Sequence, residues 1–551
     1  MERDKDYFMK KILGACIGSC VHVAGILNFL NIAKRSGYST RFSGSALDID
    51  ILLKEIDDYK PDVVAVSYRL SPESVMPVFK ELKEKIIESG NSDGIRFILG
   101  TTRPVGDIAL KLGIFSKVFT GEETLEDVER YLTGEKIKES SGIPPQALLE
   151  RVEDKSPFPI IRHHFGRPTL DETLKGIREI SESGLLDIIS IGPDQNTQEF
   201  FFHPEKMDSK QDGAGGVPLR TPEDFKKLYD ASRTGNHPLL RCYSGTNDMI
   251  RMAEILVDNI NNAWCAVPLF WYNELDNRSG RKLKQSIVEN QSLMKWHGLK
   301  NIPVEVNESH HWSLRYAPDP IAVAAAFLAA YNAKKMGVKA YVSQYMFNTP
   351  PETSFSMDLA KMLAKTELIE SLHDDDFTSI RETRAGLFSY PADFDGGKGQ
   401  LASSTLLQMQ LEPQIVHIVG YCEADHAARP DDIIESVKIA NRVIENCIYG
   451  CPDMKTDERV VKRKNELIRD AKAILNKIKE LDRGNASEDP LVDPSILSEA
   501  VATGILDAPH LCGVKAAKGT IMTMFEDGKN IAVNRDLKPI TEMKRLESLG
   551  I

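Results

Sequence analysis

The sequence has little of what marks several common protein classes. Eight cysteines occur among 551 residues and none forms a Cys-x-x-Cys pair, so neither a disulfide framework nor a zinc ribbon is indicated. Basic residues are outnumbered, 69 Lys and Arg against 81 Asp and Glu, which gives a formal charge of -12. Proteins that track phosphate backbones carry the opposite sign, so we expect no nucleic acid partner.

Long apolar runs are also missing. No stretch approaches the roughly 20 uninterrupted apolar residues of a membrane helix, and residues 1–11 are a charged start without the apolar segment of a signal peptide. We therefore expect a cytoplasmic protein with no membrane partner. The absence of a Gly-x-x-x-x-Gly-Lys loop argues against direct nucleotide hydrolysis.

The chain is long enough for two or three domains. Between residues 11 and 132, short β-branched runs alternate with amphipathic helical stretches, as in a doubly wound parallel sheet. The expected strands are residues 12–17, 40–43, 63–67, 96–99 and 117–120, and the expected helices are residues 21–35, 48–59, 72–89, 106–111 and 125–131. The pattern predicts an α/β, flavodoxin-like domain over residues 1–135.

A polar, proline-containing stretch at residues 136–158 is expected to be a linker. A second alternation follows, with expected strands at residues 188–191, 239–242, 263–268, 304–306, 340–343, 386–389 and 415–419. Seven or eight such units over about 320 residues fit a (β/α)8 TIM-type barrel, placed at residues 159–481. Residues 482–551, which are helical and then contain short strands at 520–525 and 530–533, are expected to form a C-terminal cap.

The first expected strand leads into the pattern Cys20-x-His22-x-x-Gly25, which opens a helix. His22 then lies at the carboxyl edge of the sheet, where such folds bind ligands; a loop histidine satisfied by its neighbours is the alternative. The segment resembles the cobalamin-binding domain of corrinoid enzymes, whose Asp-x-His-x-x-Gly motif falls on these three positions. The resemblance implies that His22 is the lower ligand of cobalt.

Further positions carry this resemblance as far as residue 132. Ser67 and Leu70 fall near the Ser-x-Leu of the family, with one residue more than usual between them, and the glycine turns match at residues 100–102 and 120–122. Cys20 stands where the family has Asp, and because a thiol is a weak hydrogen-bond partner, we expect the imidazole to be less firmly oriented. The cofactor-binding residues that the resemblance implies here are Cys20, His22, Gly25, Ser67, Leu70, Gly100, Thr120 and Gly121.

From about residue 162 onward the chain resembles the catalytic barrel subunit of glutamate mutase (methylaspartate mutase). The blocks that carry the likeness are Gly-Gly-Val-Pro-Leu at 215–219, Leu-Arg-Cys-Tyr-Ser-Gly-Thr-Asn-Asp at 240–248, Val-Glu-Val-Asn at 304–307, Glu-Ala at 423–424 and Gly-Ile-Leu-Asp-Ala-Pro at 504–509. In that family the cobalamin domain is usually a separate chain. The resemblance implies an adenosylcobalamin-dependent radical isomerase that acts as a homodimer.

Five residues are candidates for the barrel site. Arginine binds carboxylates through a planar fork, so Arg241 and Arg162, each near an expected strand end, are candidate clamps for a small carboxylic acid substrate; structural ion pairs are the alternative. Glu305 either contacts the substrate or pairs with Arg241. Tyr272 lies in an aromatic segment where the family has an acid, so we expect a substrate other than glutamate. Glu423 matches a family glutamate near the adenosine ribose.

Two other functions stay open. A corrinoid-dependent methyltransferase also couples a cobalamin domain to a barrel, and a non-catalytic cobalamin carrier or sensor would account for Cys20 and the missing substrate residues. The adjacent histidines at 163–164 and 310–311 leave open a further metal site or an acid–base role. On a strand, adjacent side chains point to opposite faces, so at most one of each pair faces the barrel interior.

Overall fold

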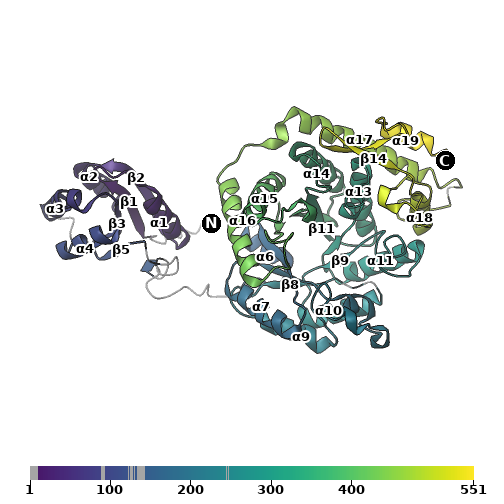
Figure 1. Ribbon diagram of the computed structural model, residues 1–551, viewed down its shortest axis with the longest axis horizontal. Helices are drawn as coiled ribbons and strands as arrows, with labels where there is room; N and C mark the ends of the chain where they lie inside the picture. Colours follow the sequence, from purple (N-terminus) through teal and green to yellow (C-terminus); the bar gives the residue numbers. More distant parts are fainter. Residues whose placement is uncertain are drawn as a thin grey trace. The chain divides into compact units, whose positions relative to one another are not determined.

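A computed structural model describes residues 10–88, 94–121, 123, 128, 131–132, 143–243, 245, 247–484 and 486–551. The chain divides into two compact units, Met1–Gly142 and Ile143–Ile551 (Figure 1). The first contains a five-stranded parallel sheet and the second an eight-stranded parallel sheet rolled into a nearly closed barrel. The fold class expected from the sequence is confirmed.

The sheet of the first unit has the strand order β2-β1-β3-β4-β5, which is flavodoxin-like. Helix α1 lies on one face of this sheet, and α2, α3 and α4 lie on the other (Figure 1). The elements are β1 (Lys11–Ile17), α1 (Ala24–Arg35), β2 (Ser39–Leu47), α2 (Ile49–Tyr59), β3 (Val63–Tyr68), α3 (Pro72–Glu88), β4 (Arg96–Thr101), α4 (Arg103–Leu112) and β5 (Lys117–Phe119).

The central strands β1 and β3 are buried almost throughout, because helices cover both faces of a parallel sheet. Their sequences are accordingly continuous apolar runs. The packing of α1 on β1 is close: a Cβ added to Gly14 would lie 2.6 Å from Cδ1 of Leu30. Glycine at this position therefore sets how near α1, and the loop that precedes it, approaches the sheet.

The second unit has eight parallel strands in the order β8-β7-β6-β13-β12-β11-β10-β9. They are β6 (Ile160–Phe165), β7 (Ile188–Ile191), β8 (Leu239–Arg241), β9 (Cys265–Val267), β10 (Val304–Val306), β11 (Ala340–Phe347), β12 (Thr378–Ala385) and β13 (Ile415–His417). At the seam between β8 and β9, the side chain of Asn262 accepts from the Cys242 N–H at 2.8 Å and donates to the Trp264 carbonyl at 3.1 Å. An amide side chain thus pairs backbone groups where the strand ladder stops.

Helices surround these strands (Figure 1). They are α7 (Leu170–Glu182), α8 (Gln195–Phe200), α9 (Pro222–Ala231), α10 (Met249–Ile260), α11 (Leu283–Leu299), α12 (Ser309–Ser313), α13 (Asp319–Lys335), α14 (Phe355–Glu370), α15 (Phe394–Gln408) and α16 (Pro430–Ile448). Short 3-10 helices occur at Pro204–Lys206, Ser209–Gln211, Leu387–Ser389, Met409–Leu411, Met454–Thr456 and Pro509–Leu511.

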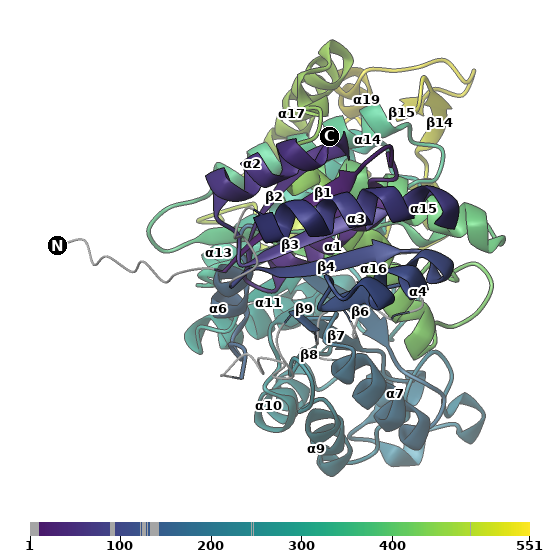
Figure 2. The ribbon, with the colours of Figure 1, turned by 90° about the vertical axis from the view of Figure 1, so that its left-hand side faces the viewer.

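The last part of the chain packs outside this ring of helices. It comprises α17 (Glu458–Lys479), α18 (Pro494–Ala502), the hairpin of β14 (Met522–Glu526) and β15 (Lys529–Val533), and α19 (Glu542–Ser548). Helix α17 packs on α13, α14 and α19, and α18 packs on α11. Figures 1 and 2 both show α17, α19 and the hairpin gathered at one side of the barrel. Residues 482–551, the segment expected to be a cap, pack on α11, α13 and α17, whereas α17, which was expected to belong to the barrel, covers α13 and α14.

Two expected assignments differ from the structure. Residues 386–389 are not a strand; the strand is β12, eight residues earlier, and Leu387–Ser389 is a 3-10 helix. Residues 143–158, expected to belong to a linker, are part of the second unit and contain helix α6 (Leu148–Lys155). Leu148 of α6 is buried in a cluster with the first residues of several barrel strands, including Ile160 and Ile415, so this apolar contact holds the helix on the barrel.

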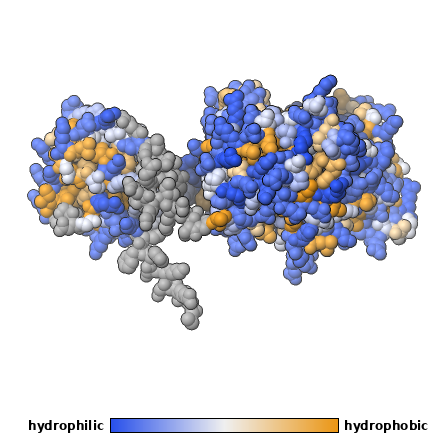
Figure 3. Space-filling model, turned by 90° about the horizontal axis from the view of Figure 1, so that it is seen from below, coloured by the Kyte–Doolittle hydropathy of each residue, from blue (hydrophilic) through white to orange (hydrophobic). Residues whose placement is uncertain are grey.

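Hydrophilic residues cover most of the face of the second unit seen in Figure 3, with hydrophobic residues scattered between them. Within the described residues, no helix combines the length and apolarity that crossing a membrane requires.

Candidate functional site

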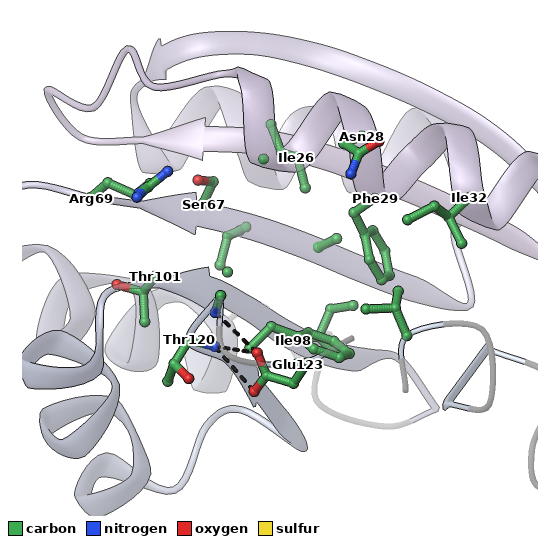
Figure 4. A pocket seen from close by; sticks show the side chains of 17 residues that line it. Ile26, Asn28, Phe29, Ile32, Ser67, Arg69, Ile98, Thr101, Thr120 and Glu123 are labelled. Atoms are coloured by element: carbon green, nitrogen blue, oxygen red, sulfur yellow. Dashed lines mark hydrogen bonds between the residues drawn. The ribbon is translucent and has the colours of Figure 1, made fainter. Parts of the chain in front are cut away.

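A groove of about 220 Å³ lies in the first unit, between α1 and the carboxyl-terminal parts of β3, β4 and β5 (Figure 4). Five of the residues expected to bind cofactor line it: Gly25, Ser67, Gly100, Thr120 and Gly121. They come from different strands and loops, and the parallel topology brings them together because strand ends meet at one edge of the sheet.

The groove exposes bare backbone. A Cβ added to Gly25, Gly100 or Gly121 would meet no atom within 4 Å, so the space above all three glycines is open. Gly121 also has φ +86, a conformation that favours glycine. Phe29 and Ile98 add apolar lining. Open peptide groups beside apolar walls suit a ligand that is partly flat and apolar and partly polar.

His22 stands at the carboxyl end of β1 with its side chain exposed. Its Nδ1 lies 3.8 Å from the Sγ of Cys20, which is fully buried and also accepts a hydrogen bond from the Arg69 N–H at 3.3 Å. Cys20 thus contacts the ring nitrogen that an orienting group would hold, which leaves Nε2 as the nitrogen available to a ligand. Leu70 is half-buried against the core of the unit and does not line the groove.

Charged side chains form a buried layer across the barrel, two residues beyond the apolar cluster at the strand starts. Glu305 is at its centre: its Oε2 lies 2.8 Å from Nη2 of Arg241 and 3.3 Å from Nη1 of Arg162. The same carboxylate accepts from Nε1 of Trp264 at 2.7 Å and from Nε2 of Gln344 at 2.8 Å. Members of this layer that are at most 1% exposed are Arg162, Arg241, Glu305 and Glu382.

These contacts define what Arg162 and Arg241 do in the fold. Burial alone would raise the pKa of Glu305, but the charges of Arg241 and Arg162 hold it below its ordinary value. Glu382 pairs with Arg162, and burial raises the pKa of Glu382. Both expected clamps are therefore committed to ion pairs, although Nε and Nη1 of Arg241 are buried without a hydrogen-bond partner.

A second polar layer lies further toward the carboxyl ends of the strands. Strand side chains two residues apart share a face, so Arg384 follows Glu382, His164 follows Arg162, and Tyr243 follows Arg241 into this layer. We call this second layer the mouth layer. Its residues are partly exposed: His164, Tyr243, Tyr272, His310, Gln344 and Arg384.

Arg384 is the positively charged residue of the mouth layer. The sequence analysis did not predict it as a site residue. Within the described residues its guanidinium makes no hydrogen bond or ion pair, and its Nε is buried without a partner. The side chain is only partly buried, and its charge acts on Glu423, whose pKa is raised by burial and lowered by Arg384. A partly buried arginine without a direct ion pair still carries a desolvation cost. This arrangement suits a ligand that brings the missing negative charge.

Tyr272 also belongs to the mouth layer. It has a φ of +67, its ring centroid lies 5.6 Å from that of His311, and the Arg278 guanidinium lies 4.8 Å from its ring. Burial raises the pKa of Tyr272 to about 12, so its hydroxyl remains a hydrogen-bond donor at neutral pH. Glu423 is exposed on the loop between β13 and α16.

The adjacent histidines are arranged differently in their two pairs. On β6, the ring of His164 lies 4.8 Å from that of His417, whereas Nδ1 of His163 lies 2.5 Å from the backbone carbonyl of His164. Burial lowers the pKa of His163 to about 4, so it is neutral. His310 and His311 lie on helix α12 and not on a strand, so the strand argument does not apply to them.

No protein-family model matches the chain, and no curated protein matches it. Among solved structures, a novel cobalamin-binding protein from Desulfitobacterium hafniense DCB-2 aligns with 22% of this chain and 56% of its own length, at 18% identity and a TM-score of 0.19. A Rubisco-like protein from Rhodopseudomonas palustris aligns with 56% of this chain and 70% of its own, at 11% identity and a TM-score of 0.31.

The cobalamin-dependent S-adenosylmethionine radical enzyme OxsB, with aqua-cobalamin and S-adenosylmethionine bound, aligns with 89% of this chain and 70% of its own, at 12% identity and a TM-score of 0.18. None of these likenesses assigns a function to this chain.

Proposed function

We propose that the first unit binds a cobalamin and that His22 supplies the lower ligand of its cobalt. The observation that carries this proposal is the groove beside α1, where bare glycine backbone at Gly25, Gly100 and Gly121 faces open space. The exposed imidazole of His22 stands three residues before Gly25 in the chain. A Cβ at any of these glycines would occupy space that a bound nucleotide tail needs. The residues present therefore fit the group.

We further propose that the protein is an adenosylcobalamin-dependent mutase that rearranges a small carboxylic acid. When bound, the cofactor supplies an organic radical through its cobalt–carbon bond. The contribution of the barrel is binding: the unpaired guanidinium of Arg384 takes the substrate carboxylate, and the neutral Tyr272 hydroxyl donates a hydrogen bond. The Arg241–Glu305–Arg162 ion pairs beneath them keep this layer rigid.

The first experiment is an anaerobic absorbance titration of the full chain with adenosylcobalamin and, separately, with methylcobalamin. We expect saturable binding of the adenosyl form, and cob(II)alamin in the spectrum when candidate carboxylic acids are added. Binding that prefers the methyl form, without homolysis, would favour methyl transfer. Equal binding of both forms without any product would favour a carrier or sensor.

Two variants separate the ligand from the groove. His22→Ala should weaken binding and remove the histidine nitrogen coupling from the paramagnetic resonance spectrum of bound cob(II)alamin, whereas His510→Ala, at an exposed histidine of the second unit, should change neither. Gly100→Leu should fill the groove and abolish binding without unfolding the sheet, because a side chain at this position would meet open space and no packed atom. Binding and coupling that survive in both site variants would overturn the assignment.

A further inference from the structure

A cluster of three metal-ligand side chains lies just beyond β13, outside the layers described above. The Sγ of Cys422 and one ligand atom each of His426 and Asp432 all lie within 4.8 Å of one another. Cys422 is 1% exposed, and the other two side chains are partly buried. A buried thiol, an imidazole and a carboxylate thus converge from one loop and the start of α16.

The histidine of this cluster is held from its far side. Nδ1 of His426 lies 2.7 Å from Oδ2 of Asp425, while its Nε2 faces Asp432, at 2.9 Å from Oδ2. A carboxylate on the outer nitrogen is the arrangement that orients a metal-bound imidazole and fixes its tautomer. The nitrogen that faces the cluster is therefore the one positioned to coordinate.

The carboxylate is positioned as well. The Arg429 N–H donates to Oδ2 of Asp432 at 2.9 Å, and the Tyr421 hydroxyl lies 3.1 Å from Oδ1 of Asp432 and 2.8 Å from Oε2 of Glu435. The Cys422 thiol, by contrast, has no hydrogen bond to another described residue and makes a hydrogen-bond contact only with its own backbone N–H. Two oriented ligands therefore lie beside a buried thiol that has no partner in another residue. A histidine–aspartate ion pair alone does not account for the thiol, whereas a metal ion bound by all three side chains would.

We propose that Cys422, His426 and Asp432 bind one zinc ion, with a water molecule as the fourth ligand. Mixed sulfur, nitrogen and oxygen ligands are typical of tetrahedral zinc, and two such N and O ligands lie about 3.3 Å apart around the ion, so a small outward shift of His426 or Asp432 accommodates it. When zinc binds, the Cys422 thiol releases its proton to solvent and coordinates as the thiolate. The hydrogen bond between His426 and Asp432 breaks, and both side chains coordinate the ion instead. The site joins the loop after β13 to α16, and none of its three ligands is among the residues expected to bind the corrinoid.

Cobalt(II) is the probe. A thiolate ligand gives it a sulfur-to-metal charge-transfer band in the near-ultraviolet, and tetrahedral geometry gives it strong visible bands. The full chain, free of corrinoid and treated with chelator, is titrated with Co²⁺ and then with Zn²⁺. We expect one equivalent of Co²⁺ to produce both bands and Zn²⁺ to remove them by displacement. Asp425→Asn should weaken Zn²⁺ binding about 10-fold or more.

Cysteine variants decide the assignment. Cys422→Ser should lose the charge-transfer band with little effect on folding, because the thiol makes no hydrogen bond to another described residue and a serine hydroxyl can also accept from the backbone N–H of residue 422. Cys20→Ser and Cys512→Ser, the second at an exposed thiol, should keep it. A band that survives Cys422→Ser, or no tetrahedral Co²⁺ spectrum at micromolar metal in the folded wild-type protein, would overturn the proposal. His426→Ala gives an independent check, since it should reduce affinity while the other thiols are unchanged.

Discussion

Nη2 of Arg241 lies 2.8 Å from Oε2 of Glu305 in the middle of the barrel, and both side chains are at most 1% exposed. A buried carboxylate that faces two arginines cannot be neutralised without leaving charge unpaired. We therefore expect Glu305→Gln to lower the free energy of unfolding by about 3–5 kcal/mol, measured by urea denaturation.

The matched control for this change is Glu367→Gln. Glu367 pairs with Lys464 at 2.7 Å, but its side chain is 54% exposed, so water already screens the interaction. The control should change the free energy of unfolding by no more than about 1 kcal/mol. Equal effects of the two substitutions would show that the Arg241–Glu305 pair contributes no more than a surface contact.

Arg384 should behave in the opposite way, because within the described residues it makes no direct hydrogen bond or ion pair, and its favourable charge contact with Glu423 is a longer-range one. Its charge opposes that of Arg162 and adds to the burial that lowers the pKa of His310. Arg384→Met should leave the melting temperature unchanged or raise it, while abolishing turnover of any carboxylic acid substrate. Arg241→Met, in comparison, should lower the melting temperature. A clear loss of stability in Arg384→Met would mean that the arginine serves the fold and not a ligand.

Cys20 offers a test of how the lower ligand is oriented. Cys20→Asp places a carboxylate next to Nδ1 of His22 and within reach of the Arg69 N–H, which already donates to the thiol. Because partners of this kind change metal affinity 10–100-fold, we expect cobalamin to bind about 10-fold more tightly. Cys20→Ala, which removes the partner, should weaken binding. If both variants bind as the wild type does, the residue at position 20 does not orient the ligand.

The sequence predicted the strands whose side chains are all apolar. Strands β1 and β3 are continuous apolar runs because both faces of the sheet are covered. Strand β12 was missed because its inward-facing residues are Glu382 and Arg384. Its sequence is therefore polar and is typical of an exposed segment. The barrel makes such a strand stable because another strand, β6, supplies Arg162 as the ion-pair partner of Glu382.

The candidate sites were predictable to different degrees. The groove residues of the first unit follow strand ends, so the cobalamin-domain motif predicted several of them. The role proposed for Arg384 depends on the absence of a direct ion-pair partner, which no motif reveals. Arg162 and Arg241 have the same residue type and the same strand position, and only the structure shows that they face Glu305. The sequence left open that Glu305 pairs with Arg241, and this ion pair is present, but nothing in the local sequence indicated that Arg162 faces the same carboxylate.

His297 gives the protein a predictable weakness toward acid. It is fully buried in α11, with Nδ1 2.9 Å from the Leu293 carbonyl and Nε2 without a hydrogen-bond partner. Burial lowers its pKa from 6.5 to about 4. Below pH 6.5 the unfolded state therefore binds a proton that the folded state refuses, and stability falls between pH 6.5 and 4, by on the order of 3 kcal/mol from this residue. In His297→Gln, whose amide does not titrate, the melting temperature should fall less steeply over this window than in the wild type. An unchanged slope would assign the acid sensitivity to other groups.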